Sequence, residues 1–424
     1  MRSKPLRQPA DQLIPELAGY QRQLLIAGGV GGAVSLIGLF SNPAQFFQSY
    51  LMAYMFVLGA TLGCLALGMI HQLSGGAWGV VTRRLIGAAS RVLPVLTLLF
   101  LPIAFGIGHL YQWSHTGIAA ADVILRGKQV YLNTPFFLAR AGVYFLAWNA
   151  LTFFLNTWSL EQDRNPDPRI ARRMQRLSGG GLLVYGLTVT FASFDWLMSL
   201  DPHWYSTIYG VLLMGGQGLT ALAFLIVALA WLSRREPLDA IVVPGHFHDL
   251  ANLMLAFVML WAYFSFSQYL IIWSGNLPEE ITWYVNRQHD GWRFIGLGLI
   301  VFHFAVPFLL LLFRSVKRAS TTVWKVAVGI LVAKLVDLFW LIAPQFHPDR
   351  LAVSWMDVVL PLSLVALWLG CFIWQLRGRA ILPVHDPQFE EALGRFLDSG
   401  RERPATGLSC DGTIGARLGG SRLK

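Results

Sequence analysis

Charged side chains are scarce in this sequence. Asp, Glu, Lys and Arg make up 13% of its 424 residues, whereas soluble domains carry about 25%. Apolar residues account for 55%, and the mean hydropathy is +0.53. The apolar residues form runs whose length is close to the roughly 20 residues that a helix needs to cross a bilayer. Since backbone groups in lipid must pair within their own segment, these runs predict an all-α, polytopic membrane protein rather than a soluble domain.

Cysteine is also nearly absent. Cys64, Cys371 and Cys410 lie far apart, and none belongs to a C-x-x-C or C-x-x-C-H pair. This excludes covalent c-type haem, a cysteine-ligated iron–sulfur cluster and a zinc-ribbon site. We therefore expect no metal site and no redox cofactor on this chain.

The net charge of +10 could suggest a nucleic-acid binder. The excess Lys and Arg, however, sits in short connections between apolar runs, and no compact basic domain exists to bind nucleic acid. Cytoplasmic loops of membrane proteins are enriched in Lys and Arg. Here the loops after even-numbered spans hold most of them, which predicts that both termini are cytoplasmic.

Ten membrane spans are predicted. They cover residues 24–40, 46–70, 88–108, 136–158, 179–200, 207–232, 247–273, 292–313, 323–343 and 355–376. Residues 1–23 form a cytoplasmic N-terminal segment. Residues 377–424 form a cytoplasmic tail, largely disordered apart from one short amphipathic helix over 387–398.

The middle eight spans show a weak internal symmetry. They divide into two groups of four, at about 46–200 and 207–343, and in each group the longest outer loop follows the second helix. Two packed four-helix bundles between two flanking helices would explain this pattern. Coincidence of loop lengths is the alternative.

Ionisable residues within the predicted spans are functional candidates, because a charge in lipid is costly. They are Asp195, His248, Asp249, His303, Lys334 and Asp337. Counted along their helices at roughly 1.5 Å per residue, they lie at inner, central and outer depths. A ladder of titratable groups at such depths is what a proton relay requires.

Each candidate also has a structural interpretation. Lys334 and Asp337 are three residues apart and can pair on one helix face, and the structural interpretation is a buried ion pair that joins helices. His303 can be a core histidine whose ring nitrogens are hydrogen-bonded within the protein. The group around His248 and Asp249 can be the start of a helix at the membrane interface. Asp195 has no basic residue nearby in sequence, so its partner must come from another helix. A haem b site is disfavoured because His303 has no second histidine at its depth.

An outer loop carries Asp201, His203 and Trp204. Asp-Pro at 201–202 is a turn signal, and the aromatics fit an interfacial belt. The functional alternative is a docking face for an extracytoplasmic partner, or the mouth of a quinol pocket.

Four segments resemble the second quinone-binding-type membrane subunit of alternative complex III, the bacterial quinol:cytochrome c oxidoreductase. They are 128–140 (KQVYLNTPFFLAR), 191–204 (FASFDWLMSLDPHW), 246–252 (HFHDLAN) and 266–280 (FSQYLIIWSGNLPEE). With the helices between them they cover most of residues 100–320. The first hundred residues and the tail match only in hydropathy.

The resemblance implies a fold similar to the NrfD-like polysulfide-reductase membrane anchor, with two four-helix bundles and two flanking helices. It implies a multi-pass subunit of the bacterial inner membrane that carries no redox centre. The expected partners are a homologous membrane subunit, which is thought to hold the quinol site, together with haem c and iron–sulfur subunits. It also implies a proton path through the chain.

Two other functions stay open. The chain can bind quinol itself near Asp195, Asp201 and His203. Alternatively it can be a secondary transporter with a midplane site at broken helices, although glycines such as those at 215–218 more often serve close packing.

Overall fold

The computed structural model describes residues 10, 14–115, 117, 121–165, 167–235, 239, 242–289 and 291–380. Within these residues ten helical segments are long and apolar enough to cross a membrane, one for each predicted span. The chain is therefore an all-α polytopic membrane protein. The helix predicted over 387–398 lies outside the described residues.

The ten segments are built from one or more helices each. They are α2 (Leu17–Ser41), α3 (Pro43–Ser74), the stretch α4 (Ala77–Ser90), α5 (Leu93–Leu98) and α6 (Leu101–Phe105), α10 (Thr134–Arg164), α11 (Pro168–Trp196) with η3 (Met198–Leu200), α12 (Tyr209–Leu232), α14 (Pro244–Gly275), the stretch α16 (Trp292–Leu299), η4 (Ile300–Ala305) and α17 (Val306–Leu312), α19 (Ser320–Ile342) with η5 (Ala343–Gln345), and α20 (Met356–Arg377). Short helices in the connections are α7 (Ile107–Leu110), η2 (Gln112–Ser114), α9 (Val123–Lys128), α15 (Pro278–Val285) and α18 (Arg314–Arg318).

Several long helices begin at an Asn or Asp cap with proline in the first turn. The Asn42 side chain accepts a hydrogen bond from the backbone N–H of Gln45 at the start of α3, and Asp167 accepts one from Arg169 at the start of α11. A capping oxygen satisfies an otherwise free N–H, and proline at this position has none to satisfy. The polar cap therefore fixes where each helix enters the apolar layer.

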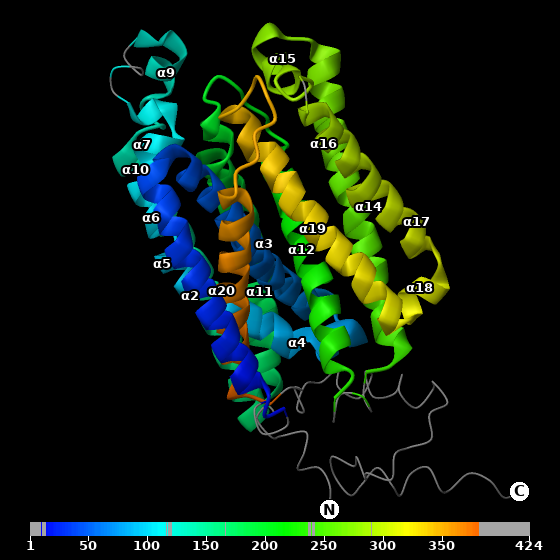
Figure 1. The fold of residues 1–424 in the computed structure, drawn as a ribbon. Helices are drawn as coiled ribbons and strands as arrows, with labels where there is room; N and C mark the ends of the chain where they lie inside the picture. Colours follow the sequence, from blue (N-terminus) through cyan, green and yellow to red (C-terminus); the bar gives the residue numbers. More distant parts are fainter. Residues whose placement is uncertain are drawn as a thin grey trace, which may run out of the picture.

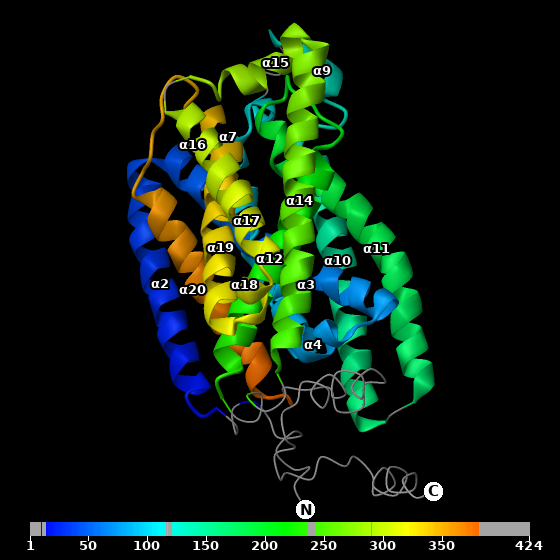
Figure 2. The same ribbon diagram turned by 90° about the vertical axis from the view of Figure 1, so that its right-hand side faces the viewer.

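The two central helices are α3 and α12. In their most apolar windows 83% and 78% of residues are buried inside the protein, against 17% for α2 and 22% for α14. The first and last spans, α2 and α20, run side by side along one flank of the molecule (Figures 1 and 2). The surfaces of the outer helices that protein does not cover are the ones available to lipid.

Each predicted group of four helices makes internal contacts. In the first group α3 contacts α4 and α11, and α10 contacts α11 and α5. In the second group α12 contacts α14 and α19, and α16 and α17 contact α19. Helices α3 and α12 also pack on each other, so that the two groups share one continuous hydrophobic core.

The third span departs from the prediction. Its helix begins about ten residues before the expected position 88, and α4 lies across one end of the bundle, in contact with α3, α10, α12, α14 and α20 (Figure 1). Arg83 and Arg84, which lie between the predicted spans 46–70 and 88–108, are therefore on this crosswise helix. Arg84 forms an ion pair with Asp163 of α10. Pro94 and Pro102 then begin α5 and α6, since proline cannot continue a helix without a break.

Helices α3 and α12 approach closely at Gly63. A Cβ atom built at this position would lie 2.1 Å from the backbone oxygen of Gln217. Small residues at a membrane helix crossing allow such backbone contact. Gly63 therefore sets the distance between the two central helices.

We expect Gly63→Leu to destabilise the protein by at least the roughly 1–3 kcal/mol that overpacking usually costs, because the obstructing atom is backbone. The measurement is the unfolding midpoint in detergent. Gly180→Leu is the control, since a Cβ there meets nothing within 4 Å. Equal midpoints for the two variants would contradict this account of the crossing.

Candidate functional site

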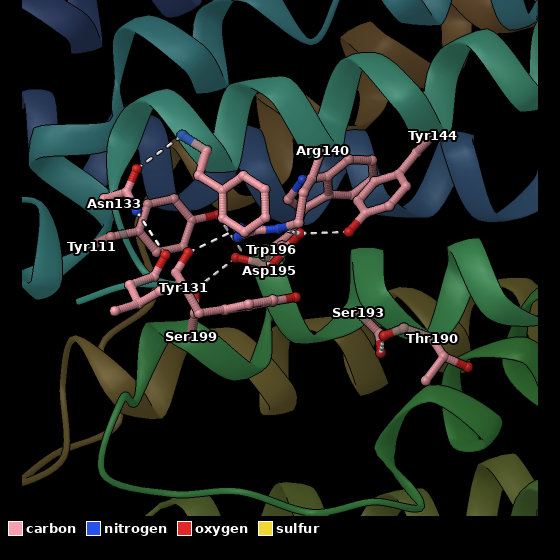
Figure 3. Close-up of polar contacts among 12 residues, drawn as sticks. Tyr111, Tyr131, Asn133, Arg140, Tyr144, Thr190, Ser193, Asp195, Trp196 and Ser199 are labelled. Atoms are coloured by element: carbon pink, nitrogen blue, oxygen red, sulfur yellow. Dashed lines mark hydrogen bonds and ion pairs between the residues drawn. The ribbon is translucent and has the colours of Figure 1, made fainter. Parts of the chain in front are cut away.

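Asp195 is fully buried near the end of α11 and is paired with Arg140 of α10. The guanidinium donates from Nε to Asp195 Oδ2 and from Nη2 to Oδ1, both at 2.8 Å (Figure 3). This two-point geometry is the strongest arrangement for an Arg–carboxylate pair. It confirms the prediction that the partner of Asp195 comes from another helix.

Tyrosines complete this cluster. The Tyr144 hydroxyl donates to Asp195 Oδ2 at 2.8 Å, and Arg140 Nη1 donates to the backbone oxygen of Tyr131 at 2.9 Å. The Tyr131 ring lies 3.8 Å from the guanidinium carbon, close enough for a cation–π contact. Three donors thus face the carboxylate of Asp195, two from Arg140 and one from Tyr144.

Two polar contacts also join the outer connection before α10 to the loop after α11. Lys128 Nζ donates to the backbone oxygen of Pro202 at 2.6 Å, and His203 Nε2 lies 2.6 Å from Asp122 Oδ2. The hydrogen bond from His203 lowers the pKa of Asp122 below its usual value. Asp201 accepts a hydrogen bond from the backbone N–H of His203, as expected of an Asp-Pro turn.

Trp204 joins the loop after α11 to helix α15. It is 1% exposed, and its ring stacks on Trp283 with a centroid distance of 4.8 Å. Beside it, Ser206 Oγ lies 3.5 Å from Gln268 Oε1 of α14. Trp204 therefore holds two outer connections together, and Tyr205 is the exposed aromatic of this loop.

Arg287 is a buried cation held by backbone. Its guanidinium donates to the carbonyl oxygens of Trp283, Trp340 and Leu341 at 2.8–3.1 Å and lies 3.4 Å from the Trp283 ring centroid. Burial lowers the pKa of Arg287 to about 9. Two of these carbonyls, those of Trp340 and Leu341, lie in the last turn of α19, where a helix dipole favours a cation. Arg287 thereby fixes the connection after α15 onto α19.

A second buried ion pair lies within α19. Lys334 Nζ is 2.6 Å from Asp337 Oδ2, and both side chains are 6% exposed, as predicted from their spacing. Gly216 of α12 makes room for the lysine, because a Cβ there would lie 2.5 Å from Nζ. The pair lies within one helix and therefore does not itself join two helices.

A small cavity adjoins Lys334 between the two central helices. Its volume is about 10 Å³, and Gln217 and Thr220 line it together with apolar side chains of α3. This is roughly the space of one water molecule, with several polar partners. Gln217 Oε1 in turn accepts a hydrogen bond of 2.7 Å from the Tyr185 hydroxyl of α11. The cavity therefore sits on a polar line from α19 through α12 to α11.

His303 is fully buried in η4, a π-helix. Pro307 has no N–H to bond the carbonyl of residue 303, and the helix changes register just before it. The imidazole lies 4.2 Å from the Trp261 ring centroid, and neither ring nitrogen has a partner in the described part of the chain. His303 is thus not the satisfied core histidine considered from sequence.

The histidines at the start of α14 divide into two environments. His246 is fully buried and its Nδ1 accepts a hydrogen bond from the backbone N–H of Val243, which caps the helix. His248 and Asp249 are half-buried one turn into α14. Nearby, Lys317 Nζ donates to Asn252 Oδ1 at 2.8 Å. His246, His248 and Asp249 therefore lie at the start of a helix, in agreement with the structural interpretation of this group.

The candidates do not form one continuous ladder. No hydrogen bond or ion pair found within the described residues joins Asp195, His303 and the Lys334–Asp337 pair to one another. Asp195 belongs to the first group of four helices. Lys334 and Asp337 lie in the second group, within electrostatic reach of His303.

Sequence reasoning missed two buried charges within the predicted spans. Arg140 lies inside the predicted span 136–158, where an ionisable residue is a candidate by the same rule that selected Asp195. Asp357 lies inside the predicted span 355–376 and accepts hydrogen bonds from Ser49 and Gln45 of α3. A systematic count of charges within spans would have found both.

Comparison of the sequence with models of protein families and with curated proteins returns no match. Among the described residues no group of three or more His, Cys, Asp or Glu side chains is placed to hold a metal ion. The polar clusters and the four segments named above are therefore the features of the chain that point to a function.

We expect Asp195→Asn to cost about 3–5 kcal/mol of stability, since it leaves the buried Arg140 cation without its partner. Arg140→Lys should also destabilise, because an ammonium cannot make the two-point contact. Chemical denaturation in detergent micelles measures both changes.

The control for this pair is Glu16→Gln, which breaks the more exposed pair between Glu16 and Arg235. Such pairs contribute roughly 0–1 kcal/mol. A loss in Asp195→Asn no larger than in this control would show that the buried pair is not a structural clamp.

Proposed function

We propose that the chain is an integral membrane subunit of a quinol-oxidising respiratory complex of the alternative complex III type, in a bacterial inner membrane. In this role it supports quinol:cytochrome c electron transfer and handles protons. Its partners are a homologous membrane subunit, haem c subunits and an iron–sulfur subunit, which carry the redox centres. The chain acts only together with them.

The observation that carries the proposal is the convergence of three of the four resembling segments. Segment 128–140 supplies Arg140 and Lys128, which bind Asp195 and the carbonyl of Pro202 in segment 191–204. Segment 266–280 supplies Gln268, which contacts Ser206 just after segment 191–204. Segments far apart in sequence thus build one polar layer, which supports a shared functional origin for them.

The two buried ion pairs have different roles in this proposal. Arg140 is always charged and holds Asp195 at two points, an arrangement suited to a fixed clamp. Lysine releases its proton more readily than arginine when buried. Lys334, beside a water-sized cavity and within electrostatic reach of His303, therefore forms the proton-handling centre with Asp337.

Co-purification tests the assignment to a complex. The tagged full-length chain, extracted in mild detergent from its native membrane, is expected to bring down subunits that contain haem c and iron–sulfur clusters. Haem absorbance and iron content of the isolated material measure this. Purification of the chain alone, or substrate uptake by the chain alone in liposomes, would overturn the assignment and favour a transporter.

We predict that Lys334→Met and Asp337→Asn lower the number of protons translocated per electron more than they lower the rate of quinol oxidation. Each removes one member of the titratable pair without touching the redox centres. The measurement is the proton-to-electron ratio of the reconstituted complex. Asp122→Asn is the control, because Asp122 lies in an outer connection. An unchanged ratio in both α19 variants would refute the proton role.

A further inference from the structure

A long apolar cavity opens between α19 and the stretch from α16 to α17. Its volume is about 750 Å³, within the range of roughly 300–1,000 Å³ typical of ligand sites. Its lining is almost wholly apolar and includes Phe302, Val306 and Val332, which are 39–66% exposed. It is therefore a groove on the surface of the bundle rather than an internal void.

Two glycines give the groove its depth. Gly298 of α16 and Gly329 of α19 both line it, and a Cβ atom at either would meet nothing within 4 Å. These glycines are therefore not needed for close packing inside this chain. Larger side chains at these positions would project into the groove.

The groove has one charged end. Lys325 and Thr322 line it and lie one turn apart near the start of α19. Lys325 is exposed and takes part in no ion pair or hydrogen bond seen in the described part of the chain. Arg314 and Arg318 of α18 are exposed just before α19. A positive end above an apolar groove matches the chemistry of an anionic head and an acyl chain.

The groove is shorter than the hydrocarbon core. Its apolar lining runs from Val326 to Val336 on α19 and from Ile295 to Leu310 on α16 to α17, which is roughly 15 Å and roughly 22 Å at about 1.5 Å of rise per residue. Both lengths are less than a hydrocarbon core of about 30 Å. A transmembrane helix of a partner would need a surface along the whole core, so the dimensions favour a lipid chain.

We infer that the groove between α16–α17 and α19 is a specific site for one anionic phospholipid, with its phosphate at Lys325 and Thr322 and one acyl chain along Gly298 and Gly329. The lipid occupies the leaflet on the α18 side. Its negative charge neutralises Lys325 at the membrane boundary, and its chain fills the space that the two glycines leave open. This site does not depend on the proposed respiratory function.

Retained lipid tests the inference. The full-length protein, alone or in the complex with which it purifies, is equilibrated in nanodiscs of phosphatidylcholine with a minor fraction of phosphatidylglycerol. It is then transferred to detergent for native mass spectrometry. We expect one retained phosphatidylglycerol per chain. Lys325→Glu should lower this occupancy about tenfold, because a charge reversal turns attraction for the anionic head into repulsion.

Two matched controls separate this site from the general lipid annulus. Arg172→Glu reverses an exposed charge on α11, away from the groove, and should leave the retained lipid unchanged. Gly329→Leu should displace the lipid while leaving Lys325 intact, whereas Gly186→Leu, also at a position open to space, should not.

Three results would overturn the inference. One is equal retention of phosphatidylcholine and phosphatidylglycerol by the unaltered protein. Another is unchanged retention in Lys325→Glu or Gly329→Leu. The third is a crosslink between residue 329 and a partner subunit in the intact complex, which would assign the groove to protein. The unfolding midpoint of each variant shows that it is folded.

Discussion

A hydrocarbon layer offers no hydrogen-bond partner to a charged side chain, so a charge carried into it is stabilised by a counterpart inside the protein. This chain meets the constraint in three ways. Asp195 is paired across two helices with Arg140, and Lys334 is paired within one helix with Asp337. Arg287, just outside the spans, is bound by three backbone carbonyls. These contacts fix which helix faces turn inward.

The three solutions differ in what they allow chemically. A guanidinium held at two points by a carboxylate is a fixed charge, and so is one held by carbonyls. An ammonium beside a water-sized cavity is a compact charge with a possible proton acceptor next to it. Arg140 is therefore suited to an architectural role, whereas Lys334 is the residue that the proposed proton role concerns. A polar line through Gln217 and Tyr185 runs from the cavity beside Lys334 to α11, the helix that carries Asp195.

Much of the fold was predictable because its signals are local. A run of about 20 apolar residues identifies a span without knowledge of its neighbours, and the i, i+3 spacing of Lys334 and Asp337 is sufficient to pair them. The third span was placed ten residues late because α4 carries Arg83 and Arg84 and resembles a loop. Its arginines find partners on α10, such as Asp163, only after the chain has folded.

The sequence predicts the site only to the extent that a charge within a span requires a partner. Asp195 required a partner from another helix, but its sequence could not say that the partner is Arg140, 55 positions away. That identity depends on how α10 packs on α11. The same limit applies to His303, whose π-helical turn follows from Pro307 but whose position against Trp261 depends on α14. Tertiary contacts thus place Asp195 in one site, with Arg140 of α10, and the Lys334–Asp337 pair in another. No hydrogen bond or ion pair found within the described residues joins His303 to either site.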